Sequence, residues 1–396
     1  MLTKYKLGEL VDVTRGMSLP GENYSESGEL IRLTLGNFNY NGGGFKENTS
    51  KSDIYYIGEV KSEYILNRGD IITPLTEQTL GLLGSTAMIP ESGKYIQSQD
   101  VALVTPDESK LDHLFCYYLV SSDVVKKQLS AAAQQTKIRH TSPDKIKDCT
   151  VWIPELKLQE KIGKTLYGID QKIALNTRMN AELEAMAKQL YDYWFVQFDF
   201  PDENGKPYKS SGGKMVWNEK LKREIPEGWE VKNAKDICQI KTGKEDANFS
   251  VENGKYPFFT CSREILKCNS FYFDGHAILI AGNGDFNVKH YTGKFNAYQR
   301  TYVLIPENIC YFGVLYFNAQ DRISSFHKVS NGSIVKFIKL GDVEDLVVFK
   351  QNNIELYVTI NEILYSIEKR MIEIEKLTHL RDSLLPMLMN GQVTIE

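Results

Sequence analysis

Residues 156–198 read LKLQEKIGKTLYGIDQKIALNTRMNAELEAMAKQLYDYWFVQF. Apolar residues recur in this stretch at alternating intervals of four and three, which is the spacing of a coiled-coil seam. The seam positions are Ile162, Leu166, Ile169, Ile173, Asn176, Asn180, Leu183, Ala187, Leu190 and Trp194. Pro154 comes just before the stretch, and proline favours the start of a helix but not its interior. We therefore expect a long helix over Leu156 to Phe198 that packs against another helix.

A second stretch with similar spacing lies near the C-terminus. Its apolar positions are Leu356, Ile360, Ile363, Ile367, Ile374, Leu377, Leu384 and Leu388. Arg370 and Arg381 interrupt this seam, and Pro386 should bend or end the helix. Two such helices in one chain most simply pack against each other in antiparallel orientation.

Asn176 and Asn180 are polar residues within the first seam. A buried polar residue lowers the stability of a helix pair, but it can fix the register and the partner. Alternatively, this part of the helix is partly exposed and both amides are solvated. The sequence favours neither interpretation over the other.

The chain also contains an internal repeat. Residues 7–16 match 234–243, residues 69–73 match 275–281, residues 95–104 match 296–305, and 137–138 with 146–148 match 333–334 with 343–345. Chance similarity between β-rich segments can explain one such match, but four matches in the same order make chance a poor explanation. The repeat is one long α/β unit used twice rather than a solenoid.

These patterns predict an α+β fold with two similar α/β domains, separated by two long antiparallel coiled-coil helices and related by a pseudo-two-fold repeat. Short Val/Ile/Tyr/Phe runs between Gly, Asn and Pro indicate strands, with helices over 111–129 and around 311–317. The expected divisions are a first domain at 1–154, a helix at 155–198, a polar Gly/Ser/Pro-rich linker at 199–224, a second domain at 225–352 and a helix at 353–391.

Composition excludes several classes of protein. Of 396 residues, 42% are hydrophobic and 25% are charged, which is ordinary globular usage and excludes a mainly disordered chain. No apolar run is long enough for a transmembrane helix, and Met1 to Glu9 lack the apolar core of a signal peptide. We therefore expect a cytoplasmic protein.

The cysteines and the net charge are less informative. The six cysteines, at 116, 149, 238, 261, 268 and 310, form no C-x-x-C pair, so we expect reduced thiols and neither structural zinc nor a disulfide framework. The net charge of −4 does not by itself indicate a nucleic-acid binder. A local basic face can nevertheless be present within such a total.

A search for catalytic motifs gives none. The chain has no G-x-x-x-x-G-K-[ST] phosphate loop and no pair of adjacent prolines, as the Pro-Pro-aromatic motif of an amino-methyltransferase would require. Residues 282–285 form a glycine turn without the full dinucleotide fingerprint, and 106–110 have the letters of a metal-dependent nuclease site without its strand spacing. The six histidines have no zinc-ligand spacing. We expect no catalysis and no metal in this chain.

Polar residues at matching places in both halves predict a nucleic-acid contact surface. Asn and Gln can pair bidentately with adenine and Arg or Lys with guanine, while Ser and Thr hold phosphates. The candidates are Thr76, Gln78, Thr79, Gln97, Gln99, Gln135, Lys137, Arg139 and His140 in the first half, and Asn283, Asp285, Asn287, Lys289, His290, Gln299, Arg300, Ser330, Asn331 and Ser333 in the second. For any single residue a solvated surface loop is the simpler explanation; the recurrence in both halves supports binding.

Four segments together resemble the specificity (S) subunit of type I restriction–modification systems. MNAELEAMAKQLYDYWFV at 179–196 looks like the central conserved helix of that family, and WIPELKLQEKI at 152–162 looks like the beginning of that helix. IPEGWEV at 225–231 resembles the usual start of the second recognition domain. LRDSLLPMLMNG at 380–391 is similar to the end of the C-terminal helix. These segments are distributed over nearly the whole chain.

The resemblance implies a non-catalytic subunit with two target recognition domains, each reading one half of an asymmetric, interrupted DNA site. The helices would set the spacer and dock two modification (methyltransferase) subunits, through Asn176, Asn180, Leu183, Leu190, Trp194, Ile367, Ile374 and Leu384. The modification subunits would carry S-adenosylmethionine and methylate adenine N6. Two restriction subunits would add ATP, Mg²⁺ and DNA cleavage for defence against foreign DNA. This chain itself would hold no cofactor.

One feature departs from the family pattern. Gln351, before the second helix, occupies the position that corresponds to Pro154 before the first helix. The second helix is therefore expected to begin differently. The recognition domains are also the variable part of such proteins, so the candidate base contacts above come from their positions alone.

Two other functions are compatible with parts of the sequence. The chain could be the recognition part of a fused methyltransferase–nuclease, which would need catalytic motifs that it lacks. It could also be a sequence-blind coiled-coil adapter or regulatory protein. A specificity subunit should lose about 1–3 kcal/mol of binding free energy per wrong base pair, whereas an adapter would show only a salt-dependent, sequence-blind interaction.

Overall fold

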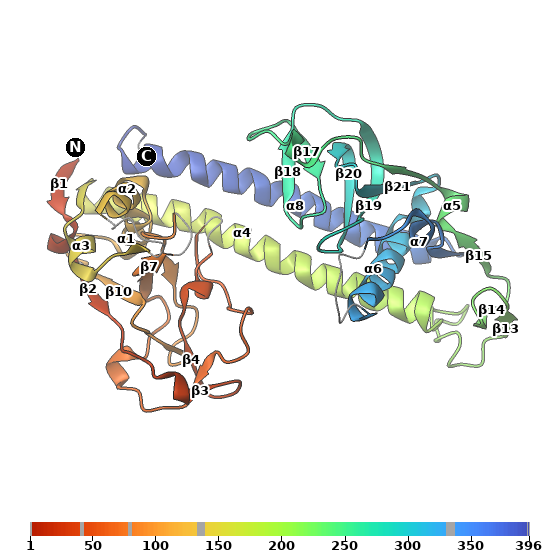
Figure 1. Cartoon of the computed structure of the whole chain (residues 1–396), viewed down its shortest axis with the longest axis horizontal. Coiled ribbons are helices and arrows are strands. Elements are labelled where there is room, and N and C mark those ends of the chain that lie inside the picture. The colour runs from red at the N-terminus through yellow and green to blue at the C-terminus, as the bar shows by residue number, and fades with distance from the viewer. Residues whose placement is uncertain are drawn as a thin grey trace. The chain divides into compact units, whose positions relative to one another are not determined.

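The computed structural model describes residues 2–39, 43–77, 81–132, 139–329, 337–393 and 395, without the side chains of 325–329. These residues form two compact units (Figure 1). Unit 1 comprises Met1–Leu175 with Ile374–Glu396, and unit 2 comprises Asn176–Glu373. Two long helices, α4 (Leu156–Tyr191) and α8 (Glu355–Met389), contribute residues to both units.

Unit 1 contains short strands and three further helices. The strands are β1 (Thr3–Lys6), β2 (Val11–Arg15), β3 (Tyr24–Ser25), β4 (Leu30–Arg32), β5 (Tyr55–Tyr56), β6 (Ile71–Pro74), β7 (Thr76–Glu77), β8 (Ala87–Met88), β9 (Tyr95–Ile96), β10 (Val101–Pro106), β11 (Arg139–His140) and β12 (Thr150–Ile153). The helices are α1 (His113–Val120), α2 (Asp123–Ala132) and α3 (Pro143–Lys147). A single helix over 111–129 was expected; instead α1 ends at Val120 and α2 begins at Asp123.

The central sheet of unit 1 has the order β2-β10-β6-β8, with antiparallel neighbours. A second sheet has the order β3-β5-β4-β9, and β1 pairs with β12 and β7 with β11. Along β10, Ala102 and Val104 pack in one core with α1, whereas Val101 and Leu103 pack in another with Phe38. Alternate residues of a strand point to opposite faces, so both faces of this sheet are covered.

Unit 2 contains the longer strands. They are β13 (Met215–Asn218), β14 (Arg223–Pro226), β15 (Glu230–Asn233), β16 (Cys238–Thr242), β17 (Tyr256–Phe259), β18 (Ile265–Cys268), β19 (Phe273–Ala281), β20 (Val288–Ala297), β21 (Thr301–Pro306) and β22 (Val347–Lys350). The helices are α5 (Ala234–Ile237), α6 (Phe312–Val329) and α7 (Leu340–Glu344). The helix expected around 311–317 is thus present as α6 and continues to Val329.

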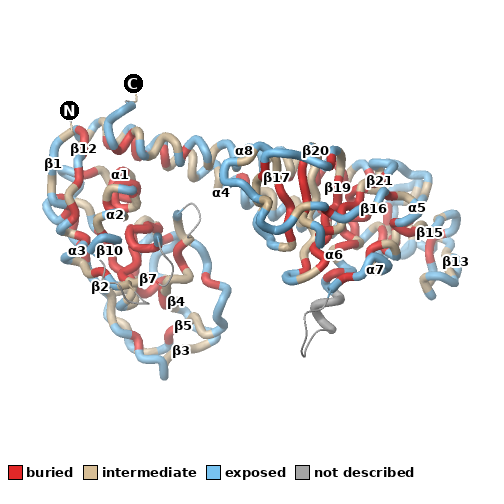
Figure 2. The backbone as a smooth tube through the Cα atoms, turned by 45° about the horizontal axis from the view of Figure 1, so that its top comes forward, coloured by how far each residue is buried: buried red, intermediate tan, exposed pale blue. Residues whose placement is uncertain are grey.

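The central sheet of unit 2 has the order β16-β21-β19-β20-β17-β18. Strands β19 and β21 in its middle are largely buried, whereas β20 is buried only at its C-terminal end (Figure 2). Ile278 and Ile280 of β19 face a core shared with α6 and both long helices, while Ala277 and Leu279 face a smaller aromatic core. The alternation again covers both faces of the sheet.

The internal repeat predicted from the sequence is confirmed by the pairing of the strands. The order β2-β10-β6 in unit 1 corresponds to β16-β21-β19 in unit 2, and the pair β1–β12 corresponds to β15–β22. A short parallel pairing also recurs, between β4 and β9 in unit 1 and between β17 and β20 in unit 2. The two units are therefore two versions of one α/β design, as the sequence matches predicted.

The long helices run antiparallel within unit 2, because Asn176 bonds Glu373 while Asn180, further along α4, bonds Ile367, an earlier residue of α8. Asn176 is 2% exposed, and its Nδ2 donates to Glu373 Oε2 at 2.9 Å. Asn180 Nδ2 lies 3.4 Å from the Ile367 carbonyl oxygen, but its Oδ1 is buried without a hydrogen-bond partner in the described part of the chain. The buried interpretation of the two seam asparagines is correct for Asn176.

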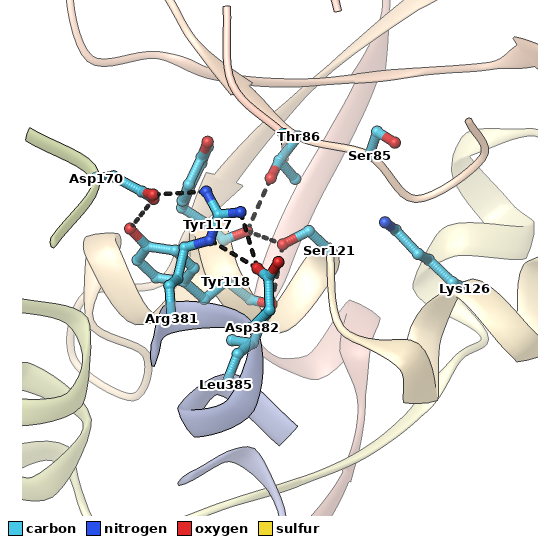
Figure 3. A pocket seen from close by; sticks show the side chains of 11 residues that line it. Ser85, Thr86, Tyr117, Tyr118, Ser121, Lys126, Asp170, Arg381, Asp382 and Leu385 are labelled. Carbon is cyan, nitrogen blue, oxygen red and sulfur yellow. Dashed lines mark hydrogen bonds and ion pairs between the residues drawn. The ribbon is translucent and has the colours of Figure 1, made fainter. Parts of the chain in front are cut away.

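In unit 1 the long helices are joined by an ion pair. Arg381 of α8, which interrupts the predicted seam, is 7% exposed and its Nη1 lies 2.8 Å from Asp170 Oδ1 of α4. Tyr118 of α1 donates to the other oxygen of Asp170 at 2.6 Å. Figure 3 shows these groups beside a pocket of about 220 Å³, with Asp382 on the far side of the guanidinium. Arg381 and Tyr118 are thus buried, whereas Asp170 is half-buried and Asp382 is exposed.

The ends of the long helices differ from the sequence expectation. Helix α4 ends at Tyr191, before the expected Phe198, and continues as a π-helical turn over Asp192–Val196. Helix α8 passes through Pro386 and ends at Met389, where the backbone N–H of Gln392 bonds the Met387 carbonyl and Gly391 has φ 66°. This Schellman arrangement ends the helix in place of the proline. At the start of α8, Asn353 Oδ1 accepts from the Glu355 N–H, so a side-chain cap replaces the proline.

The segment 199–224, predicted as a linker, is mostly exposed but is anchored to unit 2 at Phe200. Phe200 is buried, and its ring stacks on Tyr208 at 4.7 Å and on Trp229 at 4.9 Å between ring centroids. The hairpin β13–β14 follows within the same segment. The segment was predicted as a linker from its polar composition, but its aromatic residues Phe200 and Tyr208 attach it to the core of unit 2.

Candidate nucleic-acid interface

In unit 2, an exposed corner of the sheet lies between β20 and β21. A tight turn over Tyr298–Thr301 is closed by the Thr301 N–H bonding the Tyr298 carbonyl oxygen at 2.8 Å. Gln299 and Arg300 occupy the middle of this turn and are exposed. Gln299 Nε2 donates to Asp246 Oδ1 at 2.8 Å, which orients its amide.

In unit 1, the same corner lies between β9 and β10. The turn Ser98–Val101 is closed by the Val101 N–H bonding the Ser98 carbonyl oxygen at 3.0 Å. Gln99 is exposed and Asp100 is half-buried in the middle of this turn. The two turns thus present Gln99 and Asp100 in unit 1 where unit 2 presents Gln299 and Arg300.

One glycine beside each corner lets the backbone pass close to the turn. A Cβ atom on Gly16 would lie 2.2 Å from the Gln97 carbonyl oxygen, and one on Gly243 would lie 2.1 Å from the Ala297 carbonyl oxygen. Such distances exclude any side chain. These are the glycines that end the first pair of matching segments, and their close approach gives a physical reason for that match.

The loop between β19 and β20 continues the polar surface of unit 2. The exposed Arg263 pairs with Asp285, with Nε 2.6 Å from Oδ2. Asn287 Nδ2 donates to the carbonyl oxygens of Cys261 at 2.9 Å and Asp285 at 2.6 Å. Asn283, in the same loop, is half-buried. The amide of Asn287 therefore holds the loop together, which leaves Asn283, Asp285 and Arg263 at its surface.

Lys289 and His290, both on β20, are bonded to other groups of unit 2. Lys289 Nζ donates to the Ser262 carbonyl oxygen and to Asn287 Oδ1, both at 2.6 Å, and burial lowers the pKa of this lysine to about 8. The His290 side chain is 8% exposed, and its Nδ1 lies 2.7 Å from Glu368 Oε1 of α8. The predicted contact of His290 with DNA gains no support from this placement, since its ring is enclosed by the helices that cover the sheet.

In unit 1, the candidates Thr76, Arg139 and His140 lie on the paired strands β7 and β11. Arg139 Nη1 lies 3.7 Å from Glu77 Oε1, so its charge faces a carboxylate that is 3% exposed. The other oxygen of Glu77 accepts from the N–H groups of Gly81, Leu82 and Leu83. Thr76 is half-buried and His140 is exposed, so these two can reach solvent.

Gln97 has a structural role. It is 1% exposed, and its Nε2 donates to the carbonyl oxygens of Thr14 and Val101. Its amide therefore joins β2 and β10 behind the corner and does not point to solvent.

Several predicted residues lie outside the described part of the chain. They are Gln78, Thr79, Gln135, Lys137, Ser330, Asn331 and Ser333. The described residues that flank two of these segments are bonded to the corners: Thr141 N–H to the Leu75 carbonyl in unit 1, and Ile338 N–H to the Gly282 carbonyl in unit 2.

Sequence reasoning missed a cleft of about 350 Å³ that borders Gln99 and Asp100. Arg32 contributes to its wall, with the guanidinium 3.7 Å from the centroid of the Tyr24 ring. Asn48 lines the same cleft and bonds Thr34 Oγ1 at 2.9 Å. Their only sequence signal was a polar residue within a strand-rich segment, which is too common to identify a site. Arg263 was missed for a similar reason, since its partner Asp285 lies on a different loop.

Within the described ranges, no group of three or more His, Cys, Asp or Glu side chains is placed to hold a metal ion. None of the helices in those ranges combines the length and the apolar run that a membrane crossing needs.

The seam residues of the long helices lie in the cores of the units. In unit 2, Leu183, Leu190 and Trp194 are partly buried against the core, and Ile367 is 5% exposed. In unit 1, Leu384 packs against the core, while Ile374 is half-buried. Apolar residues left exposed on these helices include Leu175, Met186, Met371 and Leu380. The predicted docking residues thus serve packing within the chain, and these four residues lie outside that seam.

Comparison with known proteins identifies a family. A model of the type I restriction modification DNA specificity domain matches residues 2–185 and 226–348. The specificity subunit of the type I restriction enzyme EcoDI from Escherichia coli is 35% identical over 180 residues, which cover 44% of this chain and 40% of that protein. That alignment therefore spans less than half of the EcoDI subunit.

Two further comparisons cover more of the chain. The MjaIX specificity subunit from Methanocaldococcus jannaschii is 24% identical over 313 residues, covering 71% of this chain and 69% of that protein. The crystal structure of the S subunit of a type I restriction–modification system from M. genitalium matches with a TM-score of 0.61 at 17% identity, covering 98% of this chain and 96% of that chain. At this identity the structural match establishes the shared fold.

Proposed function

The chain belongs to the family of type I restriction–modification DNA specificity subunits, and from this we propose that each unit reads one half of an asymmetric, interrupted DNA site. The observation that carries the proposal is the repeated sheet corner. Both units fix the same turn at the same place, yet they present different side chains on it. Two equivalent surfaces with different chemistry suit two different half-sites.

We further propose that α4 and α8 set the spacing of the half-sites and dock two methyltransferase subunits. Each helix contributes residues to both units, which supports a role in fixing the spacing. Exposed apolar residues on these helices, such as Met186 and Met371, support a docking role. In this proposal S-adenosylmethionine belongs to the methyltransferase subunits, ATP and Mg²⁺ belong to the restriction subunits, and this chain provides recognition without catalysis.

The test is to produce this chain together with the methyltransferase subunit of its own system and to map N6-methyladenine across the host genome. We expect methylation at a single interrupted motif. Replacing residues 226–350 by the corresponding segment of a related subunit should change one half of that motif and leave the other half intact. Methylation of a continuous short motif would contradict the proposal, and a stable complex without sequence preference would favour an adapter.

A further inference from the structure

We propose that Arg300 and Asp100, which occupy equivalent places in the two units, each read one base pair directly: Arg300 a guanine and Asp100 a cytosine. The inference rests on the proposed function and identifies the residues through which the half-sites differ. Opposite charge at one repeated position would make the two units prefer different bases while they share one scaffold.

The equivalence of the two residues follows from their backbone bonds. The Asp100 carbonyl oxygen accepts from the Leu75 N–H at 2.8 Å, and the Arg300 carbonyl oxygen accepts from the Gly282 N–H at 2.9 Å. The next residue also matches, because the Val101 carbonyl accepts from Gly16 and the Thr301 carbonyl accepts from Gly243. The Cα positions of both residues are therefore fixed to the sheet by the same set of bonds.

The side chains, in contrast, are available. Arg300 is exposed, and in the described structure its guanidinium forms no ion pair or side-chain hydrogen bond. The nearby Arg263 is held by Asp285, and Lys289 is held by backbone and amide oxygens. Asp100 likewise has no side-chain bond within the described residues, and it lines the cleft of about 350 Å³. At both places the backbone is fixed to the sheet, while the side chain remains free to bind a ligand.

The chemistry of each side chain selects a base. The guanidinium has donors that pair bidentately with O6 and N7 of guanine, which is the commonest specific contact of arginine in the major groove. A carboxylate can only accept, and cytosine N4 is the donor that it meets there. The neighbouring Gln99 and Gln299 are the same residue type in both units, so they do not distinguish the half-sites by themselves.

The experiment uses the purified complex of this chain with its methyltransferase subunit. A panel of duplexes carries the mapped motif with every single base-pair change, and binding is measured by competition. For Arg300→Ala, discrimination should fall about 5- to 150-fold at one G·C pair, confined to the half-site that changes when residues 226–350 are replaced. Arg300→Lys should retain part of the preference, since lysine also pairs with guanine.

Asp100→Ala should reduce discrimination at one C·G pair in the other half-site and leave discrimination in the first half-site unchanged. Lys235→Ala is the control, because it removes an exposed positive charge on α5 at the opposite end of β16 from the corner. A uniform loss of affinity for Arg300→Ala, with the salt dependence reduced by about one phosphate, would overturn base reading in favour of a backbone contact. An unchanged motif for either variant would also overturn it, while the wild-type complex would still test the proposed function separately.

Discussion

The two units make the same close contact between a short helix and a long helix, but with the glycine on opposite partners. In unit 1 the glycine is Gly163 of α4, and a Cβ there would lie 2.8 Å from the Phe115 backbone nitrogen of α1. In unit 2 it is Gly313 of α6, and a Cβ there would lie 2.6 Å from Ile360 Cγ2 of α8. The short helix and the long helix therefore approach each other closely in both units, although the glycine that permits this lies on the long helix in unit 1 and on the short helix in unit 2.

An amide side chain of the long helix completes this contact in each unit. Gln159 Oε1 accepts from the Asp112 N–H at the start of α1, and Asn361 Oδ1 accepts from the Gly313 N–H near the start of α6. Both amides also donate to carbonyl oxygens just before the short helix. Two different residues thus form hydrogen bonds with the backbone groups that a helix leaves without an intrahelical partner at its start.

The polar contacts between helices differ more strongly. Unit 1 uses the charged set Arg381, Asp170 and Tyr118, whereas in unit 2 Glu184 accepts from Tyr316 at 2.8 Å and from Gln320 at 3.2 Å. A buried ion pair and a hydrogen-bonded carboxylate should respond differently when one member is removed.

The largest expected effect is in unit 1. Arg381→Met should lower the free energy of unfolding by about 3–5 kcal/mol, because it leaves Asp170 charged beside the buried Tyr118. Glu184→Gln should lower it by only about 1 kcal/mol, since the amide oxygen can still accept from Tyr316. Urea unfolding of the full chain measures both values.

The double variant Asp170→Leu/Arg381→Met is the matched control for the charged set. It should recover most of the loss, because it removes both charges from the helix contact. Equal losses for Arg381→Met and Glu184→Gln would contradict the distinction between the units.

The next effect concerns the glycines at the helix contact. Gly163→Ala and Gly313→Ala should each lower stability by about 1–3 kcal/mol through overpacking. Gly163→Ala should have the larger effect, because its new methyl group would meet backbone, whereas that of Gly313 would meet movable side chains. Gly168→Ala is the control in the same helix, and it should stabilise by about 0.5–1 kcal/mol because no atom lies within 4 Å of its Cβ position. Thermal unfolding of the three variants tests this order.

A smaller effect is expected at the seam of unit 2. Asn180→Leu should raise stability by up to about 1 kcal/mol, since the buried Oδ1 of Asn180 gains no hydrogen bond to offset its desolvation. Asn176→Leu should lower stability, because it removes the bond to Glu373. If Asn180→Leu destabilised the chain as much as Asn176→Leu, the two amides would have equal roles. Chemical denaturation of the single and double variants decides this.

The parts of the fold that could be predicted from sequence are those with a periodic or repeated signal. The seam at 162–194 and the closing glycines Gly16 and Gly243 were sufficient for the paired helices and the repeat. The contact surface was predicted less well, because exposure depends on the partner across the fold. His290 lies on β20, and only its contacts with Glu368 and α6 show that its ring is enclosed. The cleft at Asp100 is built from segments far apart in sequence, so no local pattern could indicate it.

The smallest expected effect is a difference between the two units in how fast their thiols react. Cys116 and Cys149 of unit 1 are buried, and burial raises the pKa of Cys149 to about 11 and that of Cys238 in unit 2 to about 12. Only the thiolate reacts, so at pH 8 Cys149 would be ionised in about one molecule in a thousand. Cys261 and Cys310, both in unit 2, are half-exposed. Native labelling with a disulfide reagent at pH 8 should therefore modify these two first.

DNA then separates the two accessible thiols. Cys261 Sγ lies 3.5 Å from the Arg300 carbonyl oxygen, directly at the proposed reading corner, whereas Cys310 lies in the turn before α6. Cognate DNA bound to the complex with the methyltransferase should slow labelling of Cys261 and leave that of Cys310 unchanged, as followed by peptide mass spectrometry. Cys310→Ser leaves Cys261 as the one cysteine that is not buried, and so provides a control for the rate at Cys261. Equal protection of both thiols would indicate a general closing of unit 2 on DNA, and no protection of Cys261 would place the DNA away from the corner that carries Arg300.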